Sequence, residues 1–313
     1  ERLSTTLSAR WDPGDRRPAQ IGLSRVTATV AAASGARSTA ELSGQLTRVG
    51  EQVTAAGTLR LDRMALADLS QFWPEPWGGH ARPWIVENIV GGVAHDGVVT
   101  VAGRINTDGS APLIDQFEVR LLGDDLSIAW LRPVPPVQHA RAILTMAGPD
   151  LIEVSVPTAR QGAIALQNGR VRINGLTVKD QNLSVVAEIP GGSVPDVLSL
   201  LKHPRLHLLS DHPIPIDRPA GTVRNRLEVT LPLDEDLQIE QVGIHANGQI
   251  SDLRLGGVVA GRDLDRGAIG FDVTQDGLRA SGEANLAGVP SRVAVTMDFR
   301  IDVDTLVEDC VAR

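Results

Sequence analysis

Residues 292–302 read Arg-Val-Ala-Val-Thr-Met-Asp-Phe-Arg-Ile-Asp, an unbroken alternation of apolar with polar or small side chains. Successive side chains of a β-strand point to opposite faces, so a period of two predicts a strand with one apolar and one solvated face. The same alternation recurs over residues 227–231 and 269–273. These stretches predict a β protein, and what its apolar strand faces contact decides its function.

Dipeptides typical of tight turns separate the alternating stretches. Asparagine, aspartate and glycine tolerate positive φ, which two-residue hairpin turns require. We therefore expect antiparallel hairpins at the six Asn-Gly or Asp-Gly pairs, which begin at Asp96, Asp108, Asn168, Asn174, Asn247 and Asp276.

The spacing of turn residues predicts roughly 19 short strands, each within the length range of natural strands. They are expected over 4–11, 22–32, 39–47, 51–61, 98–106, 116–122, 125–131, 140–147, 151–157, 163–167, 170–173, 176–178, 183–189, 224–231, 238–250, 253–259, 268–274, 278–286 and 292–301. This number is too large for an immunoglobulin-type sandwich. We predict a mainly β fold, an extended and curled antiparallel sheet that forms an open groove with an apolar interior and carries three short helices.

Two of the helices are expected over residues 64–72 and 83–90, the second stopped by Gly91-Gly92. The third opens after residues 191–193, where Ser193 and Asp196 have the spacing of a capping box, and Leu198 and Leu201 would form its buried face. The chain then divides into a β segment (1–62), a helical insertion (63–92), a β segment (93–190), a short helix (191–205) and a β segment (206–313), all parts of one groove. It begins at Glu1 in polar sequence, and we expect it to be a segment of a longer protein.

Composition narrows the function. The chain is 42% hydrophobic but only 3% aromatic and has no tyrosine, so its apolar surfaces are aliphatic and offer few stacking platforms for bases or sugars. Its formal net charge of -8 argues against nucleic-acid binding, which needs a cationic surface. One cysteine, Cys310, excludes an internal disulfide, and no apolar run is long enough to span a bilayer.

The sequence contains no familiar motif for catalysis. The chain has no phosphate loop, no dinucleotide-binding G-x-G-x-x-G, no G-x-S-x-G elbow and no H-E-x-x-H. The nearest metal-like cluster is His203, His207, Asp211 and His212, but Pro204 would interrupt a helix that aligned the histidines. We interpret three acidic runs as solvated turns: Asp124-Asp125, Asp234-Glu235-Asp236, and Asp263 with Asp265. Cys310 lies in a terminus that looks frayed and has no nearby histidine to activate it. We predict no catalytic residues, no metal and no cofactor.

A family resemblance rests on three blocks that span about half of the chain. The first is Phe72-Trp73-Pro74 followed by residues 81–92, Ala-Arg-Pro-Trp-Ile-Val-Glu-Asn-Ile-Val-Gly-Gly. The second runs over 164–189 into the leucine-rich residues 197–201, and the third over 221–233, ending Leu-Pro-Leu. Together they resemble the large AsmA-like proteins, in the YhdP branch beside TamB. The motif residues are Trp73, Pro74, Arg82 and Trp84, and we expect Arg82 to fix a local hydrogen-bond network.

The resemblance implies a protein anchored in the inner membrane of a Gram-negative bacterium and extended through the periplasm. Such proteins form a long β-groove with an apolar interior and act in phospholipid traffic to the outer membrane. The implied partners are phospholipid acyl chains, and the two membranes through parts of the parent chain not present here. The family has no known catalytic residues, and its members are far longer, with a transmembrane helix at the start.

Physical chemistry agrees with an apolar groove. An acyl chain in water costs about 0.8 kcal/mol per exposed methylene, so two chains of ordinary length cost roughly 25 kcal/mol. A continuous aliphatic face removes most of that cost. The candidate groove-lining residues are Val119, Leu121, Val171, Ile173, Val185, Leu227, Val229, Leu231, Ile269, Phe271, Val273, Val295, Met297 and Phe299.

Other interpretations stay open. The apolar faces could close on each other as an ordinary core, and the chain would then be a structural β-scaffold or spacer without bound lipid. A carbohydrate-active enzyme would need paired carboxylates in a cleft rimmed by aromatic residues. Three of the five tryptophans, Trp73, Trp77 and Trp84, instead lie together in the helical insertion.

Overall fold

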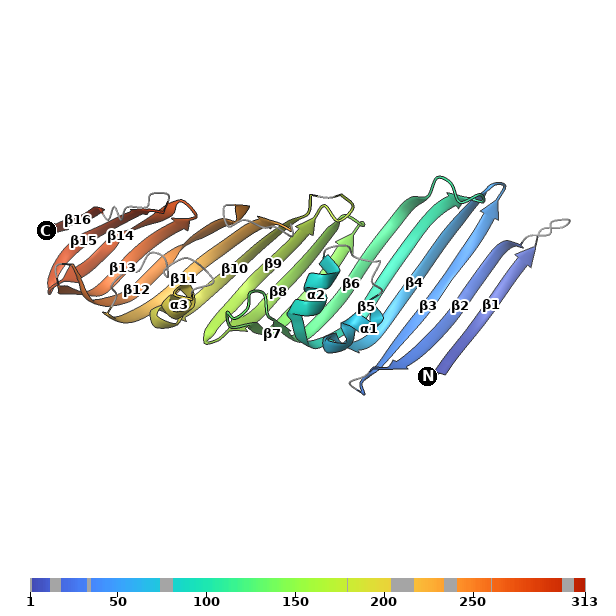
Figure 1. Cartoon of the computed structure of the whole chain (residues 1–313), viewed down its shortest axis with the longest axis horizontal. Helices are drawn as coiled ribbons and strands as arrows, with labels where there is room; N and C mark the ends of the chain where they lie inside the picture. Colours follow the sequence, from blue (N-terminus) through green and yellow to red (C-terminus); the bar gives the residue numbers. More distant parts are fainter. Residues whose placement is uncertain are drawn as a thin grey trace. The chain divides into compact units, whose positions relative to one another are not determined.

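The structure is a computed structural model that describes residues 2–11, 18–32, 35–73, 81–178, 180–203, 217–233, 241–259, 261–299 and 307–312. It is mainly β. Strands β1 to β16 follow one another in chain order in an antiparallel sheet that is not closed into a barrel (Figure 1). Three short α-helices interrupt the strands in the described part of the chain. The predicted fold class is confirmed.

The bounds of the elements are as follows. The strands are β1 (Arg2–Trp11), β2 (Pro18–Ala31), β3 (Arg37–Val49), β4 (Gln52–Ala65), β5 (Ile89–Asn106), β6 (Leu113–Ile128), β7 (Val137–Ala147), β8 (Leu151–Gln161), β9 (Ile164–Asn174), β10 (Asn182–Ser193), β11 (Asp217–Pro232), β12 (Gly243–Val259), β13 (Arg262–Thr274), β14 (Gly277–Leu286), β15 (Val289–Asp298) and β16 (Val307–Ala312). The helices are the 3-10 turn η1 (Leu66–Asp68), α1 (Leu69–Phe72), α2 (Ala81–Asn88) and α3 (Val194–Leu201).

The chain divides into two compact units, which are described separately. Unit 1 comprises Glu1–Ile128, Ala140–Ser155 and Ile173–Asp180, and unit 2 comprises Ala129–His139, Val156–Arg172 and Gln181–Arg313. Strands β1 to β6 with η1, α1 and α2 lie in unit 1, and β10 to β16 with α3 lie in unit 2. Strands β7, β8 and β9 have residues in both.

The strands are longer and fewer than predicted. Three expected breaks are wrong, because β6, β9 and β12 each run through one of them. In each case a residue with positive φ lies near the expected break: Asp125, Asn168 and Asp252, with φ of 53°, 52° and 52°. At Asp125 and Asp252 the register with the partner strand shifts, which marks a β-bulge, and a bulge bends a strand without ending it. The expected strand over 176–178 is also wrong, since these residues form a turn and bend after β9.

Only half of the six glycine dipeptides are turns. Asp108-Gly109, Asn174-Gly175 and Asp276-Gly277 lie at strand ends, as predicted, whereas the pairs at Asp96, Asn168 and Asn247 lie inside β5, β9 and β12. Asp96 has φ of 50° and sits where the β5–β6 register shifts. Gly248 has ordinary φ, but a Cβ there would lie 2.7 Å from the Cα of Asn225. That glycine allows a close approach of β11 and β12, which a sequence pattern does not distinguish from a turn.

The predicted helices exist with shifted bounds. Met64 and Ala65 end β4 and do not begin the first helix, and α2 begins at Ala81, two residues before the expected start. Gly91-Gly92 does not stop α2, because both residues lie in β5. A Cβ at Gly92 would lie 2.8 Å from the Cα of Leu126, so this glycine allows β5 to pass close to β6.

Helix α3 begins as its capping sequence predicts. The Ser193 Oγ accepts a hydrogen bond from the backbone N–H of Asp196 at 3.2 Å. Pro195 occupies the first turn, where a proline costs no backbone hydrogen bond. The helix carries its apolar residues onto the sheet: Val194 is buried, and Val197 and Leu198 pack on the same cluster.

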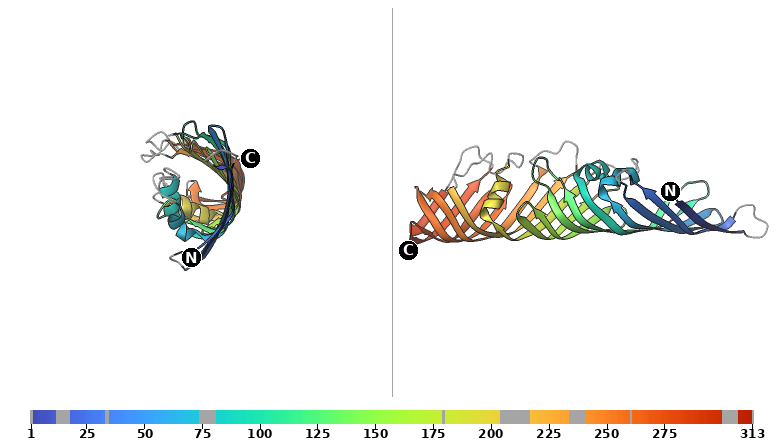
Figure 2. Two further views of the ribbon diagram at one scale, coloured as in Figure 1. Left: turned by 90° about the vertical axis from the view of Figure 1, so that its right-hand side faces the viewer. Right: turned by 90° about the horizontal axis from the view of Figure 1, so that it is seen from below.

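A line of bulges crosses unit 2 beside α3. The register shifts between Ile189 and Gly192, between Ala220 and Thr222, between Ile250 and Leu253, and between Asp265 and Ala268, on four successive strand pairs. Because bulges bend strands and increase their twist, this line curls the sheet. Helix α3 lies on the concave side of these strands (Figure 2).

Candidate functional site

The apolar residues of unit 1 align across neighbouring strands. Residues directly opposite in an antiparallel ladder carry their side chains on the same face. One row joins Val26, Leu42, Leu59, Val99 and Val119. The next joins Leu7, Leu23, Gly44, Gly57, Val101 and Phe117, and a third joins Ile21, Leu46, Ala55, Gly103 and Ile114. We call these three rows the apolar face of unit 1.

The apolar face of unit 1 is not covered within the described residues. Its large side chains are between 37% and 67% exposed at six positions: Leu7, Leu42, Leu46, Leu59, Val101 and Ile114. Single exposed apolar residues are common on protein surfaces, but a contiguous patch marks an interaction site. The helical elements bury a separate group, in which Met64, Leu66 and Ala94 are at most 8% exposed.

The opposite face of unit 1 is polar. Glu41 lies across from Arg60 in the β3–β4 ladder, and its Oε1 is 3.3 Å from the Nε of Arg25 on β2. Thr58 lies across from Ser43 on one side and Thr100 on the other. Unit 1 is therefore amphipathic, with one solvated and one aliphatic face, and we call the solvated one its outer face.

Unit 2 repeats this arrangement in four apolar rows, which we name after one member each. The Val229 row joins Val185, Val229 and Ile244. The Leu227 row joins Ala187, Leu227, Ala246, Val273, Leu278 and Met297, and the Phe271 row joins Ile189, Asn225, Gly248, Phe271, Ala280 and Val295. The Ile269 row joins Val223, Ile250, Ile269, Gly282 and Val293. Most members are half-buried. Leu183 and Leu231, which lie opposite each other, extend the same surface. The register thus makes one continuous aliphatic surface from residues up to 114 positions apart in the sequence, from Leu183 to Met297.

Helix α3 covers one of these rows. Val194 forms a buried cluster with Val223 and Ile269 of the Ile269 row and with Leu253, Leu264 and Ala284 beyond the bulges. Phe271 and Ala280 of the neighbouring row pack against this cluster from its edge. Ile269, predicted to line the groove, accordingly lies in the cluster that α3 joins.

The outer face of unit 2 carries charge in alternation. One row joins Glu188, Arg226, Asn247, Asp272, Arg279 and Thr296. Arg226 Nε lies 2.8 Å from the Oε1 of Glu228, and His245 Nε2 lies 2.9 Å from the Oδ2 of Asp272. These side chains form hydrogen bonds or ion pairs with one another at the protein surface, so this face of the sheet is solvated.

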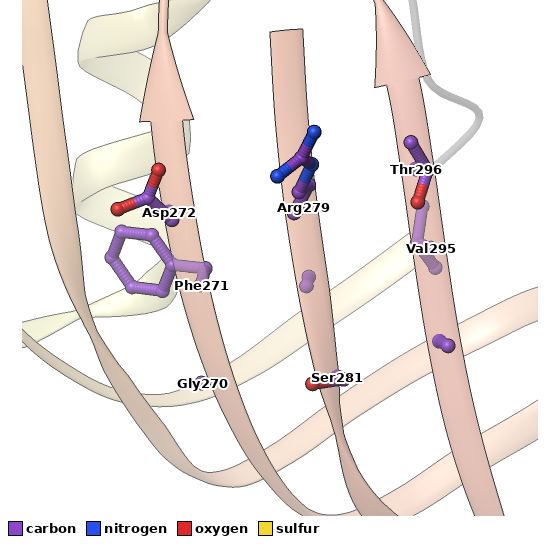
Figure 3. A pocket seen from close by; sticks show the side chains of 9 residues that line it. Gly270, Phe271, Asp272, Arg279, Ser281, Val295 and Thr296 are labelled. Carbon is purple, nitrogen blue, oxygen red and sulfur yellow. The ribbon is translucent and has the colours of Figure 1, made fainter.

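A shallow depression of about 390 Å³ crosses β13, β14 and β15 (Figure 3). Phe271, Ala280 and Val295 of the Phe271 row line it, together with Asp272 and Arg279 from the charged row. Its lining offers a mixture of aliphatic and charged groups but no constellation of nucleophile and base. Six of its nine lining residues belong to rows of the outer face, so most of the lining is on the solvated side of the sheet: Gly270, Asp272, Arg279, Ser281, Ala294 and Thr296.

The predicted groove-lining residues fall into these rows by strand. Val119 lies in the row of unit 1 that contains Leu42. A Cβ at Gly97 would touch both Leu61 and Leu121, so Leu121 lies on the same face of the sheet as Leu61. Nine candidates belong to the rows of unit 2 or extend them: Val185, Leu227, Val229, Leu231, Ile269, Phe271, Val273, Val295 and Met297. Val171 and Ile173 are half-buried in β9. Phe299 lies in the turn after β15, beyond the strand that was expected to contain it.

Sequence reasoning missed most of the apolar face of unit 1. None of the predicted groove-lining residues lies on β1 to β4, although Leu42, Leu46 and Leu59 are exposed on the apolar face there. The signal is present as the alternation Ala40, Leu42, Gly44, Leu46. Glycine interrupts it, and only the pairing of Gly44 with Gly57 reveals that both glycines belong to the apolar face.

The tryptophan and arginine motif is local scaffolding. As predicted, Arg82 fixes a hydrogen-bond network: its Nε donates to the carbonyl oxygen of Trp73 at 2.9 Å, and its Nη2 donates to that of Ser70 at 3.4 Å. Trp84 is exposed, and its carbonyl oxygen accepts a hydrogen bond from Asn88. Pro74 lies outside the described residues.

Two acidic pairs predicted to be loops are in strands. Asp124 lies in β6, where its Oδ2 accepts from His95 at 3.0 Å and its Oδ1 from Arg141 at 3.2 Å. Hydrogen bonds with His95 first and Arg141 second lower the pKa of Asp124. Asp263 lies in β13 and accepts from the N–H of Gly257 at 3.0 Å. The interpretation as loops was wrong, because both pairs lie within strands, but the expected solvation is confirmed: the side chains of Asp124 and Asp263 are 50% and 61% exposed.

Other sequence candidates have a simpler outcome. His207, Asp211, His212 and the run 234–236 lie outside the described residues. Cys310 lies opposite Val293 in β16 and not in a frayed end. Among described residues no group of three His, Cys, Asp or Glu side chains is placed to hold a metal ion. Nor does any described helix have the length and hydropathy to cross a bilayer.

Comparisons of the chain with protein-family models, with curated proteins and with solved structures give no match.

Proposed function

We propose that this chain binds phospholipid acyl chains along its aliphatic strand faces and forms a segment of a lipid-conducting β-groove. In this proposal the parent protein is of the AsmA-like type, anchored in the inner membrane and extended through the periplasm, and it conducts phospholipids to the outer membrane. The chain has no catalytic role.

The observation that carries the proposal is the exposed apolar face of unit 1. Leucine side chains at 42, 46 and 59 stay over 40% exposed on two of the three cross-strand rows. Each methylene of a ligand that moves from water onto such a surface gains about 0.8 kcal/mol. A flexible hydrocarbon chain needs no shaped pocket, only continuity of aliphatic contact from strand to strand.

The polar outer face supports the same function. A soluble path for lipid must keep water on one side and hydrocarbon on the other. The charged rows of β10 to β14 and the rows of threonine and paired charges in unit 1 provide the wet side. The low aromatic content leaves few groups for stacking a sugar or base, which favours an aliphatic ligand.

The test compares two faces of the same strands. The first variant carries Leu42→Asp and Leu59→Asp, which place two charges on the apolar face. The control variant carries Ser43→Asp and Thr58→Asp, which place two charges on the outer face at the neighbouring residues. The protein is purified from a Gram-negative host, and its lipid is measured by native mass spectrometry and extraction.

We expect phospholipid with the unaltered protein and the control, and a loss of about tenfold or more in the apolar-face variant, which corresponds to about 1.4 kcal/mol. Because Leu42 and Leu59 are exposed, the variant should fold. A folded protein without lipid in every sample would favour the structural scaffold instead.

A further inference from the structure

Helix α3 occupies part of the surface that the proposed function assigns to lipid. Val194 is 5% exposed in a cluster with Val223 and Ile269, and Val197 and Leu198 pack against that cluster. Each of these helix side chains contacts the apolar face as a ligand methylene would. The Ile269 row is thereby closed to another hydrocarbon at Val223 and Ile269.

The rows left open have a definite width. Side chains on one face of an antiparallel strand repeat every two residues, about 6.8 Å apart at about 3.4 Å per residue. Across β10 to β12 the Phe271, Leu227 and Val229 rows remain beside α3, and the pair Leu183 and Leu231 forms the rim near the ends of β10 and β11. Phe271 itself packs against the helix cluster at the border. Across these strands the three rows enclose two furrows, and each furrow seats one extended hydrocarbon chain between lines of side chains.

We propose that α3 sets the width of the apolar face in unit 2, so that this part of the chain accepts lipids with two acyl chains and discriminates against lipids with four. The inference rests on the proposed function and adds a specificity-determining element to it. A lipid leaving a bilayer exposes every chain that finds no furrow, so a four-chain lipid would place two chains over α3 or in water.

The experiment uses the full chain with Leu227→p-benzoylphenylalanine, a photoreactive residue between the Phe271 and Val229 rows on β11 that reports on unit 2 alone. The probes are vesicles containing phosphatidylglycerol with two chains, cardiolipin with four, or lysophosphatidylglycerol with one, which share a phosphate and glycerol headgroup chemistry. We expect photocapture of phosphatidylglycerol to exceed that of cardiolipin by about tenfold, equivalent to about 1.4 kcal/mol.

Two changes move the width in opposite directions. Val197→Ala with Leu198→Ala shortens the side chains that α3 places on the sheet and should raise cardiolipin capture about tenfold; Ser199→Ala on the exposed side of α3 is the control. Ala246→Phe fills the Leu227 row and should abolish capture of phosphatidylglycerol while lysophosphatidylglycerol remains. Its control is Ala294→Phe, on the outer face opposite Ser281.

The outcomes separate the two proposals. The width inference is overturned if the protein with unaltered α3 captures cardiolipin and phosphatidylglycerol equally. It is also overturned if both variants fold and neither changes the ratio of captured cardiolipin to captured phosphatidylglycerol. In both cases the proposal of lipid binding still stands. Capture of no lipid at all overturns lipid binding and the width inference together. If the α3 variant does not fold, Ala246→Phe decides, because it leaves α3 unchanged.

Discussion

Leu59 and Thr58 are neighbours in β4 whose side chains belong to different faces. Leu59 lies between Leu42 and Val99, and Thr58 lies between Ser43 and Thr100. A substitution of the same chemistry at the two positions therefore meets two different environments. This contrast at the level of single residues makes the proposed lipid binding testable without a change in fold.

His95 is the residue whose charge ties three strands of unit 1 together. Its Nδ1 is 2.8 Å from Asp96 and its Nε2 is 3.0 Å from Asp124, which also accepts from Arg141 on β7. The hydrogen bond with Asp96 is the largest cause that raises the pKa of His95 above its ordinary value of 6.5. Burial, the next in size, opposes this rise, and the hydrogen bond with Asp124 adds to it. A protonated His95 is thus favoured in the folded state.

The pH dependence of stability follows from this raised pKa. The stabilisation from His95 is fully present below about pH 6.5, the pKa of the unfolded chain, and is lost as the pH rises through the higher pKa of the folded state. We expect the difference in free energy of unfolding between the unaltered protein and His95→Gln to shrink as the pH rises from about 6 to about 8.5. Urea titrations over this range measure it, and a difference independent of pH would contradict the prediction.

At the scale of elements, α3 depends on its first residue. Ser193 Oγ accepts the N–H of Asp196, one of the helix donors that has no partner within the helix. Ser193→Ala should lower the free energy of unfolding of the region around α3 by about 1 kcal/mol. Hydrogen exchange of the α3 amides is the readout. Ser199→Ala, at an exposed position inside the helix, serves as control and should not increase exchange; equal effects of the two changes would contradict a capping role.

The elements also show where sequence reasoning succeeds. Period-two alternation located the strands, and the spacing of Ser193 and Asp196 located the start of α3. The bulges at Asp125 and Asp252 could not be foreseen, because a residue with positive φ gives the same sequence signal whether it turns the chain or bends a strand. Only the partner strand decides between the two, and a sequence does not show the partner.

The same limit applies to the candidate site across the molecule. Parity along β11 and β13 correctly grouped Leu227 with Val229 and Phe271 with Val273, since alternation fixes the face within a strand. It could not predict that α3 would cover Ile269, nor that Gly44 and Gly57 would pair on the apolar face of unit 1. Those facts depend on register and on helix packing, which involve residues distant in sequence.

At the scale of the whole molecule, both units show one design. Each has an aliphatic face and a charged or hydroxylated face on the same strands, and among the described residues no large side chain is less than 2% exposed. Apart from the buried residues around the helices, such as the cluster that α3 joins, many apolar side chains of the described strands remain partly exposed to solvent. The proposed ligand accounts for that surface.

The most direct test is photocapture of phospholipid at four successive positions of β11. In separate proteins, p-benzoylphenylalanine replaces Leu227, Glu228, Val229 or Thr230, and each protein is irradiated with vesicles of phosphatidylethanolamine and phosphatidylglycerol. Captured lipid is identified by mass spectrometry. Lipid should be captured at 227 and 229 and not at 228 and 230, because alternate side chains of a strand face opposite sides. Capture that is absent at all four positions, or equal at all four, would contradict an acyl-binding face.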